Sequence, residues 1–213
     1  MLKYRPFEMH CHTRHSDGTF LVPQLIESVA AYGYAGLALT DHNAVTGLLE
    51  VTEELQRKNN CLVLPGIEWT TFYGHLLVIG CDRFVDWRFV TPDTIDEALQ
   101  EIRAAGGIAG VAHPCEVGSP LMCGCNWEFR VKRWDLMDYV EIWSGPDPHA
   151  SAKNGLAMPW YDALLNQGYH LAISAGRDWH GPDKPGQIPL LTATYLGIDG
   201  DVTIENAKAA IRA

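Results

Sequence analysis

The feature that most constrains this chain is the stretch HCHTRHSDG at residues 10–18. Residues two apart on an extended segment point to the same side, so His10 and His12 can bring two imidazoles to one ion. Asp17 follows after a turn that ends at Gly18, a residue for which a positive φ costs little. Two imidazoles and a carboxylate suit Zn, Fe or Mn better than Ca or Mg. The alternative is a chance pair of histidines on a surface strand. The positions of the other histidines and carboxylates in the sequence distinguish the two interpretations.

Short apolar runs alternate with helical patterns along the chain. We expect strands at about residues 7–10, 37–39, 61–64, 75–79, 107–112, 139–143, 170–174 and 191–196, and helices at about 22–32, 47–58, 93–105, 156–166 and 204–212. Alternating β and α units predict a largely parallel sheet with crossover helices, buried on both faces as in a barrel or a doubly wound sheet. We expect one domain over residues 1–213, because no linker or repeat interrupts the pattern.

The net charge and the apolar runs of the sequence argue against some classes of binding partner. A net charge of −10 argues against a stable complex with nucleic acid or an anionic membrane surface, and no apolar run is long enough to span a membrane. The first residues lack the apolar stretch of a signal peptide, so we expect a cytoplasmic protein with reduced thiols. Cys115, Cys123 and Cys125 either hold a soft metal or are incidental loop thiols. Composition does not predict the oligomeric state.

Polar side chains follow the ends of most expected strands. Glu68 and His113 each come directly after an apolar run, and Asp178-Trp179-His180 repeats the spacing of His10 and His12. In a barrel, active sites are built at the carboxyl ends of the strands. A lone histidine is more often a hydrogen-bonded structural residue, but the whole set at successive strand ends favours a metal constellation.

In chain order, these motifs resemble those of the polymerase and histidinol phosphatase (PHP) superfamily. The matching stretches are residues 10–18, Thr40-Asp41-His42-Asn43, Gly66-Ile67-Glu68, His75, Ala112-His113-Pro114 and Asp178-Trp179-His180. The opening motif and the stretch GIEWTTFYGH look most similar to the small PHP metal-dependent phosphoesterases and the related carbaryl-hydrolase branch. The resemblance implies a distorted seven-stranded (β/α) barrel with two or three transition-metal ions (Zn, Mn or Fe) at its carboxyl-terminal face.

The resemblance also implies a ligand set. Its members would be His10, His12, Glu68 and Asp178 for the first ion, a bridging Glu68 with His75 and His113 for the second, and Asp17, His42 and His180 for the third. Two neighbours depart from the family pattern, in which position 177 often holds serine rather than arginine and position 179 a smaller residue than tryptophan.

The function implied is hydrolysis of a phosphoester of a small molecule or nucleotide by a hydroxide that bridges two metal ions. The alternatives are cleavage of a carbamate or carboxylic ester at the same centre, and a metal-binding module without catalytic activity. The substrate would be a small molecule, and the sequence does not identify it.

Other side chains are candidates for catalysis or substrate binding. Arg14, His15, Lys153 and Arg177 could contact phosphate, and Arg177 is preferred because it adjoins a ligand and can bind two oxygens at once. His15 or His180 could protonate the leaving oxygen. Asp41 either orients a ligand imidazole or caps a loop. Trp143 is expected on the same strand face as Glu141, as a wall of the substrate pocket.

Overall fold

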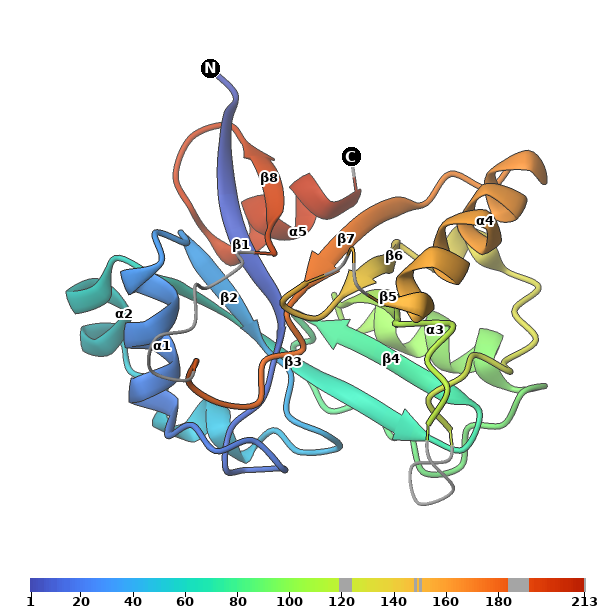
Figure 1. Cartoon of the computed structure of the whole chain (residues 1–213), viewed down its shortest axis with the longest axis horizontal. Helices are drawn as coiled ribbons and strands as arrows, with labels where there is room; N and C mark the ends of the chain where they lie inside the picture. The colour runs from blue at the N-terminus through green and yellow to red at the C-terminus, as the bar shows by residue number, and fades with distance from the viewer. Residues whose placement is uncertain (119–123, 148, 150, 184–191, 213) are drawn as a thin grey trace.

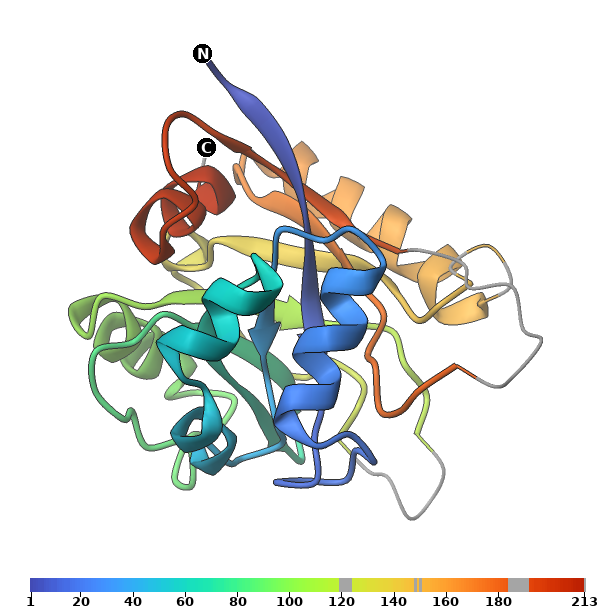
Figure 2. The same cartoon turned by 90° about the vertical axis from the view of Figure 1, so that its left-hand side faces the viewer.

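One curved sheet organises the chain, with helices packed along its outside (Figures 1 and 2). The computed structural model describes residues 1–118, 124–147, 149, 151–183 and 192–212. The strand order is β7-β6-β5-β4-β3-β2-β1-β8. The strands are β1 Lys3–Cys11, β2 Gly36–Leu39, β3 Leu62–Thr71, β4 Gly74–Ile79, β5 Ile108–Ala112, β6 Tyr139–Ser144, β7 Ala172–Gly176 and β8 Thr194–Ile198. Residue 191, where the last strand was predicted to begin, lies outside the described residues.

The helices follow the predicted pattern with one exception. They are α1 Val22–Ala31, α2 Glu53–Asn59, α3 Ile95–Ala104, α4 Ala152–Asn166 and α5 Ile204–Arg212, with short 3-10 helices at Thr46–Glu50 (η1) and Trp134–Leu136 (η2). The continuous helix predicted over residues 47–58 is wrong. Val51 is extended there, and the Thr52 side chain accepts a hydrogen bond from the Leu55 amide (3.1 Å), so a new helix begins.

The predicted α/β barrel class is confirmed, but the sheet is mixed. Parallel pairs join β1 to β2, β2 to β3, β5 to β6 and β6 to β7, whereas β4 runs antiparallel to β3 and β5, and β8 antiparallel to β1. The reason lies in β3, which continues to Thr71 and reaches β4 through only two residues, Phe72 and Tyr73. A connection this short joins only antiparallel strands, because a parallel pair needs a crossover of a dozen or more residues.

The segment after β7 brings the two sides of the sheet together. The Trp179 amide donates to the His10 carbonyl (3.0 Å), and the His12 amide donates to the Trp179 carbonyl (2.9 Å). These bonds place residues 177–179 beside the end of β1, so strands β1 to β7 form a nearly closed barrel with β8 as an added edge. The carboxyl ends of β1, β2, β3, β5 and β7 therefore meet at one face.

Three apolar clusters surround the sheet. One lies under α1, where Leu25 and Phe20 pack with Trp179. A second lies under α3 and includes Trp69, and the third contains Phe7 and residues of α5. Figure 2 shows α1 and α2 in front of the sheet on one side. Among the described residues, no helix is both long and apolar enough to cross a membrane.

Candidate metal centre

All nine predicted ligands lie at the carboxyl-terminal face. His10 is the second-last residue of β1, His42 follows β2, His113 follows β5, and Asp178 and His180 follow β7. His75 reaches the same face from the start of a strand, because β4 is antiparallel and Thr70 of β3 pairs with His75. In an all-parallel barrel, the start of this strand would lie at the opposite face. The antiparallel hairpin instead places His75 beside the other candidate ligands.

Glu68 is the centre of this arrangement. It is fully buried, and five imidazole nitrogens lie between 2.8 and 3.3 Å from its two oxygens. Burial alone raises the pKa of Glu68, but the charge of His10 and hydrogen bonds from the surrounding imidazoles outweigh it and hold the pKa well below its usual value. A carboxylate so enclosed stays ionised.

The two oxygens of Glu68 face different histidines. Oε1 lies 2.8 Å from His75 Nδ1 and 3.2 Å from His113 Nε2. Oε2 lies 3.0 Å from His10 Nε2 and 3.3 Å from His12 Nε2. His42 Nδ1 is also 3.0 Å from Oε2. A carboxylate that presents one oxygen to each of two ligand sets has the geometry that a bridging ligand requires.

Asp178 completes the set on the Oε2 side. Its Oδ1 lies 3.1 Å from His12 Nε2 and 3.4 Å from His10 Nε2. Burial raises the pKa of Asp178, but the charge of His10 and the hydrogen bond from His12 bring it well below its usual value. The backbones of Asp178 (φ 50°) and His113 (φ 25°) lie in the left-handed region, which side chains other than glycine rarely adopt. Strained backbones of this kind cluster at functional sites.

A third group is open to solvent. His12, Asp17, His42 and His180 each offer a ligand atom within 4.8 Å of the others. His180 Nε2 lies 3.2 Å from Asp17 Oδ1, and His42 Nε2 lies 3.6 Å from Asp17 Oδ2. The Asp17 side chain is 60% exposed, so this group forms the outer part of the centre.

The donor set fits transition-metal ions. Imidazole nitrogens and carboxylate oxygens are mixed in every group, which suits Zn, Mn or Fe. Within the part of the chain that the structure describes, three buried ring nitrogens have no hydrogen-bond partner, namely His12 Nδ1, His75 Nε2 and His113 Nδ1. The rings of His12 and His180 stack with centroids only 4.1 Å apart. Protonated rings this close would repel one another, whereas ligation to cations would hold them as neutral imidazoles.

Asp41 holds the loop at residues 12–18 in place through hydrogen bonds to its backbone and hydroxyl groups. Asp41 accepts hydrogen bonds from the Thr13 amide (2.6 Å), the Thr13 hydroxyl (2.7 Å) and the Ser16 hydroxyl (2.8 Å). None of these bonds reaches an imidazole, so the loop-capping alternative describes Asp41. Gly18 does not have the positive φ that the turn suggested. It is needed because a Cβ there would lie 2.6 Å from the His12 carbonyl carbon.

The preferred phosphate contact, Arg177, is engaged elsewhere. Its side chain is buried, forms an ion pair with Asp183, and lies 3.9 Å from the ring centroid of Trp179. To reach a phosphate at the metal ligands, the guanidinium would have to leave this packing. The geometry therefore lends no support to a substrate-binding role for Arg177.

Arg14 and His15 also have partners away from the cluster. Arg14 Nε donates to the Thr19 carbonyl (3.2 Å). His15 uses both ring nitrogens, with Nδ1 2.9 Å from the Thr46 hydroxyl and Nε2 2.8 Å from Glu50. Phosphate binding by either residue, and proton donation by His15, stay predictions.

Trp143 does not share a face with Glu141. The pairing of β6 with β7 shifts by one residue between these two positions, which breaks the alternation of faces. Glu141 is fully buried beside the candidate ligands His10 and His113, whereas Trp143 is 40% exposed and lines a cavity with Tyr34 and Ala175. The expectation that Trp143 and Glu141 face the same way is therefore wrong.

The cysteines contribute no ligand among the described residues. Cys11 packs between two ligands, and its Sγ donates to the Ala38 carbonyl (3.1 Å). Cys115 and Cys125 belong to none of the groups of potential metal ligands, and Cys123 lies outside the described residues.

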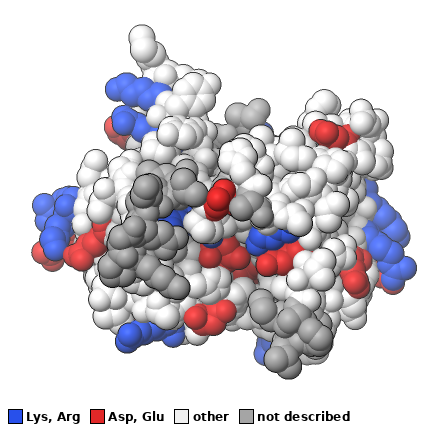
Figure 3. All heavy atoms as spheres, in the orientation of Figure 1, with Lys and Arg blue, Asp and Glu red and all other residues white. Residues whose placement is uncertain are grey.

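Two further charged residues lie beside the candidate ligands: Glu116, which was not predicted, and Lys153, one of the predicted phosphate contacts. Glu116 Oε2 lies 3.4 Å from His113 Nδ1, and Glu116 forms a potential ligand group with His113 and Asp178. Lys153, from the first turn of α4, lies 2.8 Å from Glu116 and 3.3 Å from the Ser144 hydroxyl. Glu116 was missed, although its position three residues after a ligand was a usable signal. Figure 3 shows acidic side chains near the middle of this face with basic side-chain atoms beside them.

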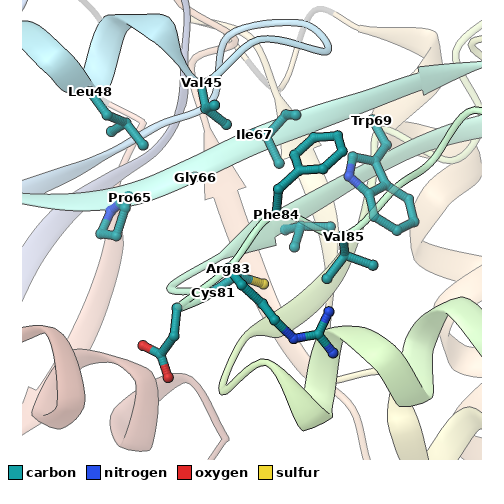
Figure 4. Close-up of a pocket in the computed structure, with 12 residues that line it drawn as sticks. Val45, Leu48, Pro65, Gly66, Ile67, Trp69, Cys81, Arg83, Phe84 and Val85 are labelled. Carbon is teal, nitrogen blue, oxygen red and sulfur yellow. The ribbon is translucent and has the colours of Figure 1, made fainter.

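A small apolar pocket lies apart from the metal centre. It has a volume of about 190 Å³ and is formed by β3 and residues 81–85. Figure 4 shows Phe84 beside Ile67 and Trp69 in this pocket. None of the nine ligands lines it.

Comparison with known proteins agrees with this geometry. The family model of the PHP domain matches residues 8–109, just under half of the chain. A two-domain protein from Bacteroides vulgatus, containing a predicted PHP-like metal-dependent phosphoesterase, shares the fold with a TM-score of 0.69 at 17% identity, over 99% of this chain and 63% of that one. The predicted resemblance to the PHP superfamily is confirmed.

Two further relatives are similar over different extents. A 3′,5′-nucleoside bisphosphate phosphatase from Chromobacterium violaceum is 34% identical over 79 residues, which cover 35% of this chain and 27% of that protein. The match thus spans about a quarter of the relative's length. An amidohydrolase from the same organism has a TM-score of 0.56 at 19% identity, covering 87% of this chain and 90% of that one.

Proposed function

We propose that this chain is a metal-dependent hydrolase that cleaves a phosphoester of a small molecule or nucleotide. The observation that carries the proposal is Glu68, a buried, ionised carboxylate that offers one oxygen to His75 and His113 and the other to His10 and His12. The match to the PHP domain and the short similarity to a nucleoside bisphosphate phosphatase support the same reaction class.

The proposed ligand roles follow the contacts. His10, His12 and Asp178 would hold one ion with Glu68 Oε2, and His75 and His113 a second with Oε1. Asp17, His42 and His180 would hold a third at the open side, with His12 beside them. Bound divalent cations would offset the charge of the phosphoryl oxygens and lower the pKa of water toward neutrality.

Lys153 is the candidate phosphate contact that the geometry favours. Its side chain is 19% exposed, and its ammonium group lies 2.8 Å from Glu116, which itself lies 3.4 Å from the candidate ligand His113. Lys153 can donate to a phosphoryl oxygen on the His113 side of the centre, while Glu116 keeps the ammonium in place. The pair adds no net charge to the site, so the excess positive charge of the bound ions remains available to an anionic substrate.

The proposal is tested with metal-loaded protein and a panel of mono-, di- and cyclic phosphoesters, including nucleoside 3′,5′-bisphosphates, beside aryl carboxylic esters. We expect release of inorganic phosphate from at least one phosphomonoester. Hydrolysis of the carboxylic esters alone would overturn the assignment of substrate class, and no turnover of any ester would favour a non-catalytic metal-binding module.

Lys153→Met provides a sharper test on the same panel. Loss of a charged hydrogen bond costs about 1.5–3 kcal/mol, so kcat/KM for the best phosphoester should fall roughly 10- to 150-fold. The matched control is Lys132→Met, because Lys132 is an exposed lysine whose side chain makes no ion pair with the described residues. If both variants kept the wild-type kcat/KM, Lys153 would not be a phosphate contact.

A further inference from the structure

Glu141 is a buried carboxylate that contacts two candidate ligands of the proposed metal centre, and it belongs to none of the potential ligand groups found among the described residues. Its side chain is fully buried in β6, and its Oε1 lies 3.0 Å from His10 Nδ1. Its Oε2 lies 3.2 Å from the same nitrogen and accepts a hydrogen bond from the His113 amide (3.1 Å). One side chain thus connects the ends of β1 and β5.

The contact with His10 decides which ring nitrogen faces the ions. A carboxylate can only accept hydrogen bonds, so a neutral His10 carries its proton on Nδ1 and leaves Nε2 as a lone pair. Nε2 is the atom that lies 3.0 Å from Glu68 and 3.4 Å from Asp178. Both the ring orientation and the tautomer are then those that ligation requires.

We propose that Glu141 is a positioning residue that fixes His10 and the His113 backbone for metal binding. The inference rests on the metal centre proposed above and adds a residue outside its ligand set. The space around Glu141 is closed as well, because a Cβ on Gly176 would lie 2.6 Å from Glu141 Oε1 and 2.6 Å from His10 Cβ. The carboxylate therefore has little room to turn away from His10.

Glu116 is a second carboxylate beside a candidate ligand, but it forms no hydrogen bond to the His113 ring. It lies 3.4 Å from His113 Nδ1, its side chain is 28% exposed, and it shares its charge with Lys153. Outer carboxylates that orient ligand histidines typically contribute 10- to 100-fold in metal affinity. We expect the larger effect at Glu141, where burial removes competition from water.

Glu141→Gln is the main test, because in either orientation the amide places its amino group, itself a donor, against a donor that the carboxylate now accepts from. If the amide oxygen takes the Oε2 position, the amino group faces the proton on His10 Nδ1. In the reverse orientation, the amino group faces the His113 amide. Glu141→Asp is the second variant and retains the charge but withdraws it by one methylene. The matched control is Glu8→Gln, since Glu8 is equally buried but its Oε1 accepts only from the backbone amides of His10 and Arg177 (3.0 and 2.9 Å).

The measurement is Zn²⁺ affinity of metal-free protein by competition with a chromophoric chelator, together with the absorption spectrum of the Co²⁺-loaded protein. We expect affinity for the most tightly bound ion to fall 10- to 100-fold in Glu141→Gln, with a changed Co²⁺ spectrum, a smaller fall in Glu141→Asp, and no change in Glu8→Gln. Wild-type affinity and spectrum in both Glu141 variants would overturn the inference, and so would an equal loss in Glu8→Gln.

The experiment distinguishes a folding defect from a loss of metal affinity. Far-ultraviolet circular dichroism of each metal-free variant shows whether it is folded, and if Glu141→Gln does not fold, the folded Glu141→Asp decides the question on affinity alone. No substrate is needed, so a negative substrate panel would leave this result interpretable. Conversely, unchanged metal affinity would overturn the role of Glu141 and leave phosphoester hydrolysis standing.

Discussion

Replacing Glu68 by glutamine should remove most of the activity while changing the fewest atoms. The amide has nearly the shape of the carboxylate but carries no charge and only one acceptor oxygen. Whichever way it lies, its amino group faces either His75 and His113 or His10 and His12. One of the two ligand sets then meets a donor where it now meets an acceptor.

The expected size follows from the burial of the site. Glu68 is fully enclosed, and removing one partner of a buried charged pair typically costs about 3–5 kcal/mol. That cost falls on the stability of the folded protein. Loss of a preorganised charged group at a catalytic centre separately lowers the rate, typically by about 10²- to 10³-fold, and we expect kcat/KM to fall by at least this much. We also expect the metal content to fall by at least one ion per chain, because a neutral oxygen bridges two cations poorly.

The assay combines elemental analysis of protein purified without chelator with phosphate release from the best substrate of the panel. His170→Ala is the control, since His170 is exposed and belongs to none of the ligand groups among the described residues. A Glu68→Gln protein with wild-type kcat/KM and full metal content would refute the bridging assignment.

Other consequences of the geometry can be tested separately. Burial raises the pKa of Glu8 from its usual 4.5 to about 8, so the folded state retains a proton that the unfolded state releases. The free energy of unfolding therefore falls as the pH rises from about 4.5 to 8, by about 1.4 kcal/mol per pH unit. The advantage of Glu8→Gln in urea unfolding of metal-free protein should grow over this window, and a pH-independent difference would contradict the argument. Arg177→Ala should cost about 3 kcal/mol of unfolding free energy by removing the cation that pairs with Asp183 and leaving it only the hydrogen bond from the Tyr32 hydroxyl among the described residues. It should change kcat/KM less than threefold, and a large kinetic effect with unchanged stability would return Arg177 to the substrate site. Chelation of the metal-loaded protein should lower Tm, since ions that bind only the folded state stabilise it.

The fold could be predicted where local pattern and topology agree. Alternating apolar and helical segments indicated the barrel class, and the pattern of α1, with Val22 and Leu25 buried on one face, appeared as expected. The direction of β4 could not be read from its residues, because an apolar strand has the same pattern in either direction. It depends on where β3 ends, and β3 continues seven residues beyond its predicted end at Leu64.

The positions of the candidate ligands could be predicted in part for a related reason. A side chain at a strand end is placed by the strand itself, so His10 in β1 and His113 directly after β5 reach the barrel face wherever the longer loops go. Substrate contacts depend on those loops instead. Arg177 adjoins the ligand Asp178 in sequence, yet its guanidinium packs on Trp179, whereas Lys153 arrives from a separate helix. Adjacency in sequence is therefore a weak guide to side chains beyond the ligands.

The backbone of the centre shows why two buried glutamates should differ in importance. His113 and Asp178 both hold left-handed backbone conformations, each of which costs about 1–3 kcal/mol and persists only if neighbouring contacts fix it. Glu141 accepts from the amide of His113, and Glu8 accepts from the amide of Arg177, directly before Asp178. For Glu8 that bond needs only an acceptor oxygen, which glutamine also provides. For Glu141 both oxygens face His10 Nδ1 and one also accepts from the His113 amide, so a glutamine would turn its amino group toward one of these donors, whereas a carboxylate accepts from both.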